Sequence, residues 1–305
     1  MSRPPGLGGP GHALPRLGNP PPGQDRPGHA LPRLGIGWRP ELAAFVAGRA
    51  DLGFAELVAE GLHPHEPLPG PLAELAGRGV TLIPHGVRLS VGSAERPDPE
   101  RIAHLAACAE LLGAPLVSEH VAFVRASGLD AGHLLPVPRT RAALDVLVAN
   151  VREAEAGLPV PLALEHIAAL LQWPDAELDE ADFLVELLNR TGVSLLLDLA
   201  NLHAGARNHG IDPLAFLDRL PLERIAYVHV AGGAEAGGLY HDTHAHATPP
   251  EVLELVTELC RRTTPPGIML ERDDGYPPPA ELAAELDAIA AAARRGLTAS
   301  GAARA

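Results

Sequence analysis

The stretch Val193-Ser194-Leu195-Leu196-Leu197-Asp198-Leu199-Ala200-Asn201 begins as a short apolar run and ends in polar side chains. The run has the length of a buried strand and is shorter than an ordinary helix. Asp198 comes at its carboxyl end, where a charged side chain is costly to bury unless it is paired or binds a metal. The stretch therefore predicts a buried strand that carries a functional carboxylate at its end.

Similar runs occur eight times, at residues 34–38, 53–57, 80–83, 115–118, 160–164, 193–197, 225–230 and 267–270. Amphipathic helices are predicted between them, at residues 40–49, 72–78, 99–112, 139–156, 180–191, 213–220, 249–262 and 279–293. Asp98-Pro99 and Asp212-Pro213 are typical helix N-caps. Eight strand–helix units predict a single (β/α)₈ TIM-type barrel. A doubly wound sheet has the same alternation, but no GxGxxG motif follows the first strand.

Composition divides the 305 residues into three parts. Residues 1–32 are rich in Pro and Gly, and Pro-Gly-His-Ala-Leu-Pro-Arg-Leu-Gly occurs at residues 10–18 and again at 27–35. Such a segment buries too little apolar surface to fold, so we expect a disordered arm. Residues 33–295 form the predicted barrel domain, and residues 296–305 are predicted to be a flexible tail.

The charge balance excludes some partners. Acidic side chains number 38 against 24 basic ones, and Lys does not occur, which argues against nucleic acid or an anionic membrane as a partner. No apolar run reaches the roughly 18 residues of a membrane span. The two cysteines, Cys108 and Cys260, lie in predicted helices and form no disulfide framework. These features predict a soluble cytoplasmic protein.

Polar side chains that bind metals stand at the carboxyl ends of almost all predicted strands, including Glu56 after the second. In a barrel these ends meet at one mouth, where the active site lies. Imidazole and carboxylate together suit iron, manganese or zinc. Nine candidate ligands exceed what one ion needs, so two or three ions are expected. The candidates are His85, His120, Glu165, Asp198, Asn201, His229, Asp242, His244 and Glu271.

Other histidines and the cysteines have simpler interpretations. A single strand-end His is more often structural than a ligand, and it is the joint pattern that indicates a metal site. His203 and His246 add side chains near the mouth, although an HxH pair is a weak signal alone. Structural or solvent-facing roles are expected for His12, His29, His63, His65 and His104, and helix packing for Cys108 and Cys260.

Several short motifs, in order, resemble the multinuclear non-haem iron-dependent oxidative enzymes. They are His85-Gly-Val-Arg-Leu-Ser-Val-Gly92, Ser118-Glu-His120, Leu164-Glu165, Leu197-Asp-Leu-Ala-Asn201, Asn208-His-Gly210, Val228-His-Val-Ala-Gly-Gly233, Asp242-Thr-His244 and Glu271-Arg-Asp-Asp274. The resemblance covers roughly residues 34–290. Two departures are His166, where the family usually has Asn, and Ala200, where it usually has the first of two asparagines. They leave the candidate ligands in place and change the hydrogen bonds that orient ligands, so they bear on the reaction more than on the metal site.

The resemblance implies a (β/α)₈ barrel with two or three iron ions that uses O₂ to modify a ribosomally made precursor peptide, often at Cys. It implies His85 and His120 on one iron, with Glu165 bridging to a second. Asn201, His229 and Glu271, with Asp198 in or beside the set, complete that second site, and Asp242 and His244 supply the third. It also implies that a partner protein captures the leader peptide.

Catalytic roles are therefore expected for Glu165, His120 and Asp242. Arg272, Asp273 and Asp274 on the last loop are expected to bind the peptide. One alternative is a divalent-metal hydrolase or isomerase of the endonuclease or sugar-isomerase barrel type. The acidic charge weighs against DNA, and a sugar isomerase would normally use a lysine that this chain lacks. A non-catalytic metal-binding or scaffolding protein is a third alternative, and fold alone does not decide among them.

Overall fold

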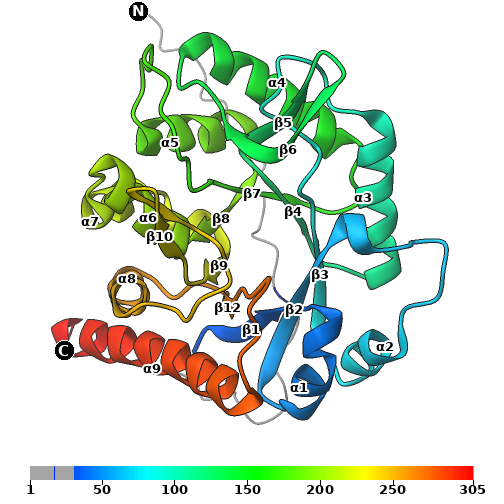
Figure 1. Ribbon diagram of the computed structural model, residues 1–305, viewed down its shortest axis with the longest axis vertical. Coiled ribbons are helices and arrows are strands. Elements are labelled where there is room, and N and C mark those ends of the chain that lie inside the picture. The colour runs from blue at the N-terminus through cyan, green and yellow to red at the C-terminus, as the bar shows by residue number, and fades with distance from the viewer. Residues whose placement is uncertain (1–16, 18–30, 305) are drawn as a thin grey trace, which may run out of the picture.

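All eight predicted strands form, and they close into a barrel of parallel strands, which confirms the predicted fold (Figure 1). The computed structural model describes Leu17 and residues 31–304. Around the barrel the strand order is β1-β12-β9-β8-β7-β4-β3-β2. The bounds are β1 (Arg33–Gly37), β2 (Leu52–Val58), β3 (Thr81–His85), β4 (Val117–His120), β7 (Leu162–Glu165), β8 (Ser194–Asp198), β9 (Ile225–Val230) and β12 (Gly267–Leu270).

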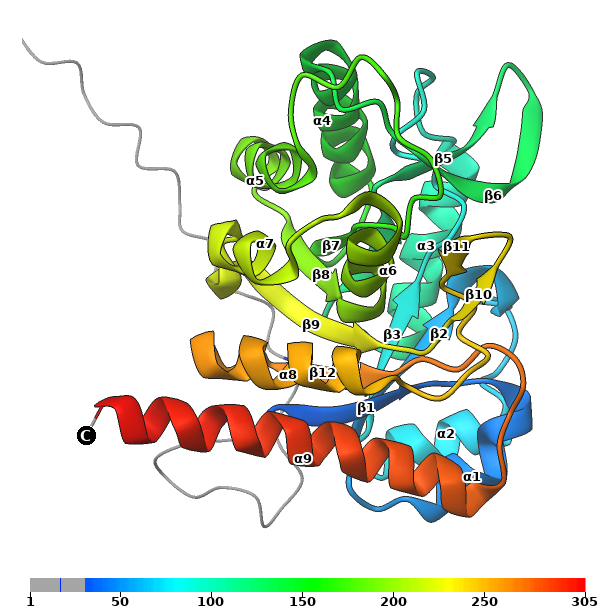
Figure 2. The ribbon, with the colours of Figure 1, turned by 60° about the vertical axis from the view of Figure 1, so that its left-hand side comes forward.

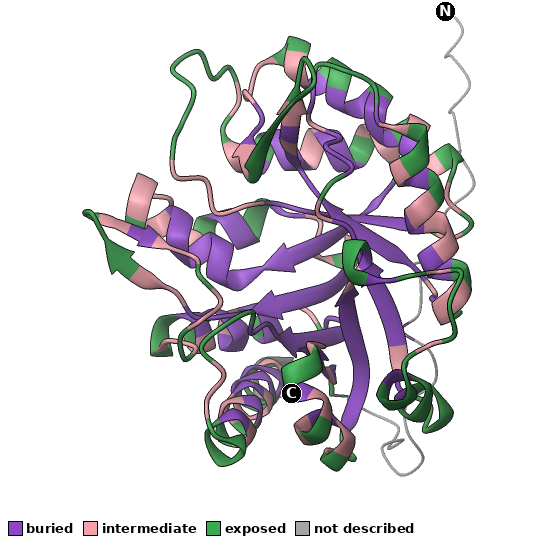
Figure 3. Cartoon of the chain, turned by 45° about the vertical axis from the view of Figure 1, so that its right-hand side comes forward, coloured by how far each residue is buried: buried purple, intermediate pink, exposed green. Residues whose placement is uncertain are grey.

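Helices surround the strands, and their outer faces carry the exposed residues (Figure 3). The Asp98 and Asp212 side chains accept hydrogen bonds from backbone N–H groups of the following first turns, as predicted for N-caps. The bounds are η1 (Pro40–Leu42), α1 (Ala43–Gly48), η2 (Ala59–Gly61), α2 (Gly70–Gly77), α3 (Pro99–Leu112), α4 (Arg141–Ala156), α5 (Glu180–Thr191), α6 (Leu199–His209), α7 (Pro213–Arg219), η3 (Leu222–Arg224), α8 (Pro250–Arg262) and α9 (Pro279–Arg304).

Two hairpins and one helix were not predicted. One hairpin pairs β5 (Ala122–Ala126) with β6 (Leu129–Pro136), and the other pairs β10 (Ala234–Ala236) with β11 (Leu239–His241). Both project on the same side of the molecule (Figure 2). The residues after β8, expected as a loop, form helix α6. Its N-cap is Asp198, whose carboxylate accepts from the N–H groups of Ala200 and Asn201.

The chain end differs from the predicted flexible tail, because α9 continues through residues 296–304. Close packing on α8 explains the difference. A Cβ atom at Gly296 would lie 2.3 Å from the carbonyl oxygen of Thr257, so the two helices touch backbone to backbone. Leu297 is buried in the same contact region. The expected disordered arm, residues 1–32, falls almost wholly outside the described residues.

Apolar side chains fill the end of the barrel where the strands begin. This inner cluster is separate from the larger core between strands and helices, and its strand residues are Phe54, Ile83, Leu116, Ala163, Leu196, Ala226, Tyr227 and Met269. Leu17, which occupies the same place in the first repeat copy as Leu34 of β1 in the second, is buried in this cluster. No helix in the described part of the chain is long and apolar enough to cross a bilayer.

Candidate metal centre

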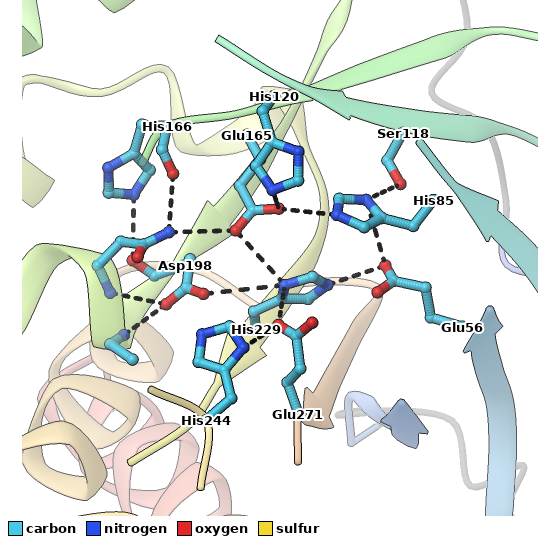
Figure 4. A network of polar contacts seen from close by, with 12 residues as sticks. Glu56, His85, Ser118, His120, Glu165, His166, Asp198, His229, His244 and Glu271 are labelled. Atoms are coloured by element: carbon cyan, nitrogen blue, oxygen red, sulfur yellow. Dashed lines mark hydrogen bonds and ion pairs between the residues drawn. The ribbon is translucent and has the colours of Figure 1, made fainter. Parts of the chain in front are cut away.

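The alternation of side chains along each strand directs the predicted site residues into the barrel. Successive side chains of a strand point to opposite faces, so a residue two positions beyond an inward-facing one also faces inward. Seven polar residues at or near strand ends stand two positions after a member of the inner apolar cluster, whereas His120 stands two positions after Ser118. This relation holds for Glu56, His85, Ser118, Glu165, Asp198, His229 and Glu271, which form a polar layer above the apolar one. All are buried, and Figure 4 shows them converging.

The first group consists of His85, His120 and Glu165. The Oε2 atom of Glu165 lies 3.6 Å from Nε2 of His85 and 3.5 Å from Nε2 of His120. The opposite nitrogen of each ring is held, because Nδ1 of His85 contacts the Ser118 hydroxyl at 2.8 Å and Nδ1 of His120 contacts the Gly86 carbonyl at 3.2 Å. Both Nε2 atoms are therefore directed at Glu165 and available to a metal.

The second group surrounds His229, which is fully buried. Its Nε2 atom lies 2.9 Å from Oε2 of Glu56, which also accepts a hydrogen bond from the Tyr227 hydroxyl. Its Nδ1 atom faces three carboxylates, at 3.0 Å from Glu271, 3.5 Å from Glu165 and 3.8 Å from Asp198. Nδ1 is thus the nitrogen that can bind a metal shared with these carboxylates.

The third group lies nearer the surface, on the loop after β11. Nε2 of His244 is 2.6 Å from Oδ2 of Asp242, and Nδ1 is 3.1 Å from Oδ2 of Asp273 and 3.4 Å from Oε2 of Glu271. Glu271 therefore contacts both this group and His229. The three groups are continuous, with Glu165 joining the first two and Glu271 the last two.

Several buried atoms of the centre have no hydrogen-bond partner in the described structure. They are Oε2 of Glu165, Oδ2 of Asp198, Nδ1 of His229 and Oδ1 of Asp242. An unpaired buried polar atom is costly, and four in one place fit a set of residues that bind metal. Metal bonds of about 2.1 Å place neighbouring ligand atoms roughly 3.0–3.4 Å apart, close to the separations around Glu165.

The electrostatics also favour cations. Five carboxylates, from Glu56, Glu165, Asp198, Asp242 and Glu271, meet four imidazoles. Burial, together with the neighbouring carboxylates of Asp242 and Glu165, raises the pKa of Asp198 to about 7. Burial lowers the pKa of His120, but the charges of Glu165 and Glu119 outweigh it and raise that pKa to about 9. The donor set of imidazole nitrogen and carboxylate oxygen, without thiolate, fits iron, manganese or zinc.

The structure brings eight of the nine candidate ligands into these groups, and the ninth, Asn201, lies beside them. Its Nδ2 atom donates to Oε1 of Glu165 at 3.1 Å and to the His166 carbonyl at 2.8 Å. His203 and His246 stay outside, since His203 stacks edge-on against Tyr240 and His246 contacts Thr243. His166, the residue in place of the usual Asn, contacts the Asp198 carbonyl at 3.0 Å.

The three residues that were expected to bind the peptide lie in three different environments. Arg272 is buried, pairs with Glu285 of α9 at 2.5 Å and does not line the cavity above the centre, so a role in peptide binding stays a prediction. Asp274 is exposed and accepts from the backbone of Gly275. Only Asp273 lines the cavity above the centre. It pairs there with Arg39, a residue the sequence argument missed.

A cavity of about 220 Å³ opens directly over the centre. Its floor is formed by His120, Glu165, Asn201, Asp242 and His244. Its walls come from β6, the β7–α5 loop, the end of β11 with the loop after it, and the β12–α9 loop. The wall residues are His133, Leu134, Ile167, Ala168, Leu170, His241, Thr243 and Asp273. The unpredicted hairpin β5–β6 thus supplies one side of the space that a substrate would enter.

Comparisons with known proteins place the barrel in a family of enzymes. Residues 33–294 match the family model described as RiPP precursor modification enzyme MbnB/TglH/ChrH. A UPF0276 protein of Streptomyces avermitilis is 57% identical over 262 residues, which cover 84% of this chain and 54% of that relative. This chain therefore spans about half of that longer relative. A UPF0276 protein of Caulobacter vibrioides is 34% identical over 267 residues, covering 86% of this chain and 95% of the relative.

Solved structures confirm the fold alone. A xylose isomerase domain protein from Alicyclobacillus acidocaldarius gives a TM-score of 0.56 at 16% identity, covering 87% of this chain and 99% of its own. An L-ribulose 3-epimerase gives 0.55 at 17% identity, covering 90% and 96%. Since the family model matches nearly all of the barrel, the chain belongs to the MbnB/TglH/ChrH family of RiPP precursor modification enzymes.

Proposed function

We propose that this protein uses two or three iron ions and O₂ to oxidise a precursor peptide, at a Cys residue. Membership of the family supports a peptide substrate and an enzymatic role. The donor set of nitrogen and oxygen without thiolate fits iron, manganese or zinc, and the resemblance to the non-haem iron-dependent oxidative enzymes favours iron among them. The observation that carries the proposal is the position of Glu165. Its Oε2 atom, which has no hydrogen-bond partner, faces two histidines while Oε1 lies 3.5 Å from a third.

In this proposal His85, His120 and Glu165 would hold one ion. Glu165, His229, Glu271 and Asn201, with Asp198 beside them, would hold a second. Asp242 and His244 hold an outer ion. Bound iron would supply the redox chemistry with O₂ and favour the deprotonated form of a substrate thiol. The protein fixes the ligands: Gly86 and Ser118 orient two imidazoles, and the α6 N-terminus fixes one oxygen of Asp198.

The cavity gives the substrate its position. His120, Glu165 and Asp242, to which we assign catalytic roles, lie on its floor, while Leu134, Ile167 and Leu170 line its walls. Apolar walls exclude water from a side chain that reaches the centre, and a less polar setting strengthens the electrostatic contacts there. A Cys side chain of the peptide would enter this cavity with the flanking residues outside. A separate leader-binding partner protein is part of the proposal.

The test is co-expression with a small Cys-containing peptide encoded beside the gene, together with any partner encoded there. Mass spectrometry of the peptide should show a mass change that requires O₂ and disappears with the His120→Ala variant. Modification by iron-loaded His120→Ala at the wild-type rate would contradict the assignment. An unchanged peptide with every neighbouring candidate, alongside zinc- or manganese-dependent turnover of a sugar, would favour the isomerase alternative.

A further inference from the structure

His244 has an unusual backbone conformation. Its φ is +51°, in the left-handed region that residues other than Gly seldom adopt. Such a conformation persists when the surrounding structure holds it, and it is found most often at functional sites. The inner ligand candidates lie at strand ends, where the sheet fixes them, whereas His244 lies on a loop. Its position therefore depends on what the neighbouring loop provides.

That neighbour is the loop between β12 and α9. The backbone N–H of Asp273 donates to the His244 carbonyl at 2.9 Å, and the Asp273 carboxylate lies 3.1 Å from His244 Nδ1. The two loops also meet at Gly275, with φ of +58°, where a Cβ atom would lie 2.6 Å from the carbonyl of Ala245. Asp273 thus holds His244 at both backbone and ring.

Arg39, just after β1, holds Asp273 in turn. Its Nη2 atom pairs with Oδ1 of Asp273 and lies 3.7 Å from Oε1 of Glu271. Its Nη1 atom donates to the Trp38 carbonyl at 2.9 Å, which fixes the guanidinium against the barrel. Only 15% of the Arg39 side chain is exposed, whereas Asp273 is 41% exposed. A well-anchored cation therefore fixes a carboxylate that is otherwise close to solvent.

We infer that Asp273 and Arg39 are positioning residues for the outer metal position formed by Asp242 and His244. An Asp273 carboxylate that accepts from Nδ1–H of His244 leaves Nε2 as the ligand atom, and Nε2 is the atom that faces Asp242. Arg39 keeps that carboxylate in place. Occupancy of the outer position then depends on this contact between two loops, while the inner positions do not. The inference rests on the metal centre of the proposed function.

The experiment measures iron binding and does not depend on activity. Metal-free protein is titrated anaerobically with ⁵⁷Fe(II), and Mössbauer spectra count the bound sites. Loss of such a supporting contact lowers metal affinity about 10- to 100-fold. We expect Asp273→Ala to lower the affinity for the outer iron by that factor and to leave the affinity for the inner iron unchanged. Arg39→Met should lower the outer affinity by the same factor and the inner affinity by less, because Arg39 also lies 3.7 Å from Glu271. Asp273→Asn, whose amide oxygen still accepts, and Arg39→Lys should recover part of the affinity.

Arg190→Met is the matched control, because Arg190 pairs with Asp145 at 2.7 Å between outer helices. It should bind iron as the wild type does. Wild-type affinity at every position in Asp273→Ala and Arg39→Met, or an equal loss at all positions, would overturn the inference and leave the proposed function standing. A wild-type protein that binds no iron would overturn both.

Discussion

The Nε2 atom of His229 lies 2.9 Å from Oε2 of Glu56, and this contact decides which ring nitrogen faces the centre. With Nε2–H donating to Glu56, Nδ1 keeps its lone pair and points at Glu165 and Glu271. Glu56 is therefore best understood as the residue that orients His229, although it stands among the possible ligands. The Tyr227 hydroxyl donates to the same Glu56 oxygen and fixes the carboxylate from the side of the inner apolar cluster.

Replacing Glu56 separates its hydrogen-bonding role from its charge. Glu56→Ala should lower metal affinity about 10- to 100-fold at the inner position that His229 and Glu271 form, because His229 loses the contact that selects its tautomer. Glu56→Gln, which keeps an oxygen acceptor, should lose much less. Anaerobic metal titration of both variants checks this, and equal losses in the two would show that the carboxylate is itself a ligand.

Glu165 is predicted to be the most sensitive residue of the centre. Glu165→Gln keeps the shape of the side chain but offers one oxygen donor in place of the two carboxylate oxygens that the proposed bridge would need. Since loss of a supporting contact alone costs about 10- to 100-fold, we expect peptide oxidation to fall at least about 100-fold. Metal content should fall with it. Glu110→Gln, at an exposed position on α3, is the matched control and should keep both at wild-type levels.

Metal removal should destabilise the barrel. An ion present at 100 to 1,000 times its Kd stabilises the folded state by about 3–4 kcal/mol, and each kcal/mol shifts Tm by about 2–4 °C in a domain of 150–250 residues. Calorimetry with and without a chelator should therefore show a fall in Tm of roughly 10 °C. An unchanged Tm would contradict a metal bound at this centre.

Asp198→Asn should shift Tm in opposite directions in the metal-free and the metal-loaded protein. Asn caps a helix as well as Asp does, so α6 keeps its N-cap while the centre loses one negative charge. The variant should raise the Tm of the metal-free protein, because burial and nearby carboxylates already disfavour the Asp198 charge. It should lower the Tm of the metal-loaded protein. A shift in the same direction in both states would contradict this account.

Leu17 offers a stability test far from the centre. Its side chain is 2% exposed and packs in the inner apolar cluster beside Phe54. Leu17→Ala should cost about 2 kcal/mol or more, as buried leucines do, while Leu31→Ala, 45% exposed, should cost little. Denaturant unfolding compares the two. Equal losses of unfolding free energy in the two variants would show that Leu17 does not contribute to the core of the barrel.

The sequence was most informative where the strand pattern and the site coincide. Short aliphatic runs ending in His, Asp or Glu predicted the barrel and the residues that gather at its mouth, because the pleat and the parallel arrangement bring such ends together. The same alternation, applied to the last strand, also explains Arg272: Glu271 faces inward, so the next residue faces outward to Glu285.

Three features were missed in the sequence because their local signals are weak or contradictory. The Gly237-Gly238 pair between two short runs is typical of a hairpin turn, but those runs are only three residues long. Helix α6 was missed because its Asn, Gly and His residues favour a loop, although Asp198 is a good N-cap. Arg39 has no local signal, since its partner Asp273 is 234 residues away in the chain.

The most direct test of the central claim is elemental analysis of protein purified anaerobically, with Mössbauer spectroscopy after ⁵⁷Fe labelling. The arrangement around Glu165 predicts two or more iron ions per chain with exchange-coupled signals, because in the proposed centre this carboxylate would bridge neighbouring ions. Stoichiometric zinc or manganese that persists when iron is plentiful would contradict the oxidative function.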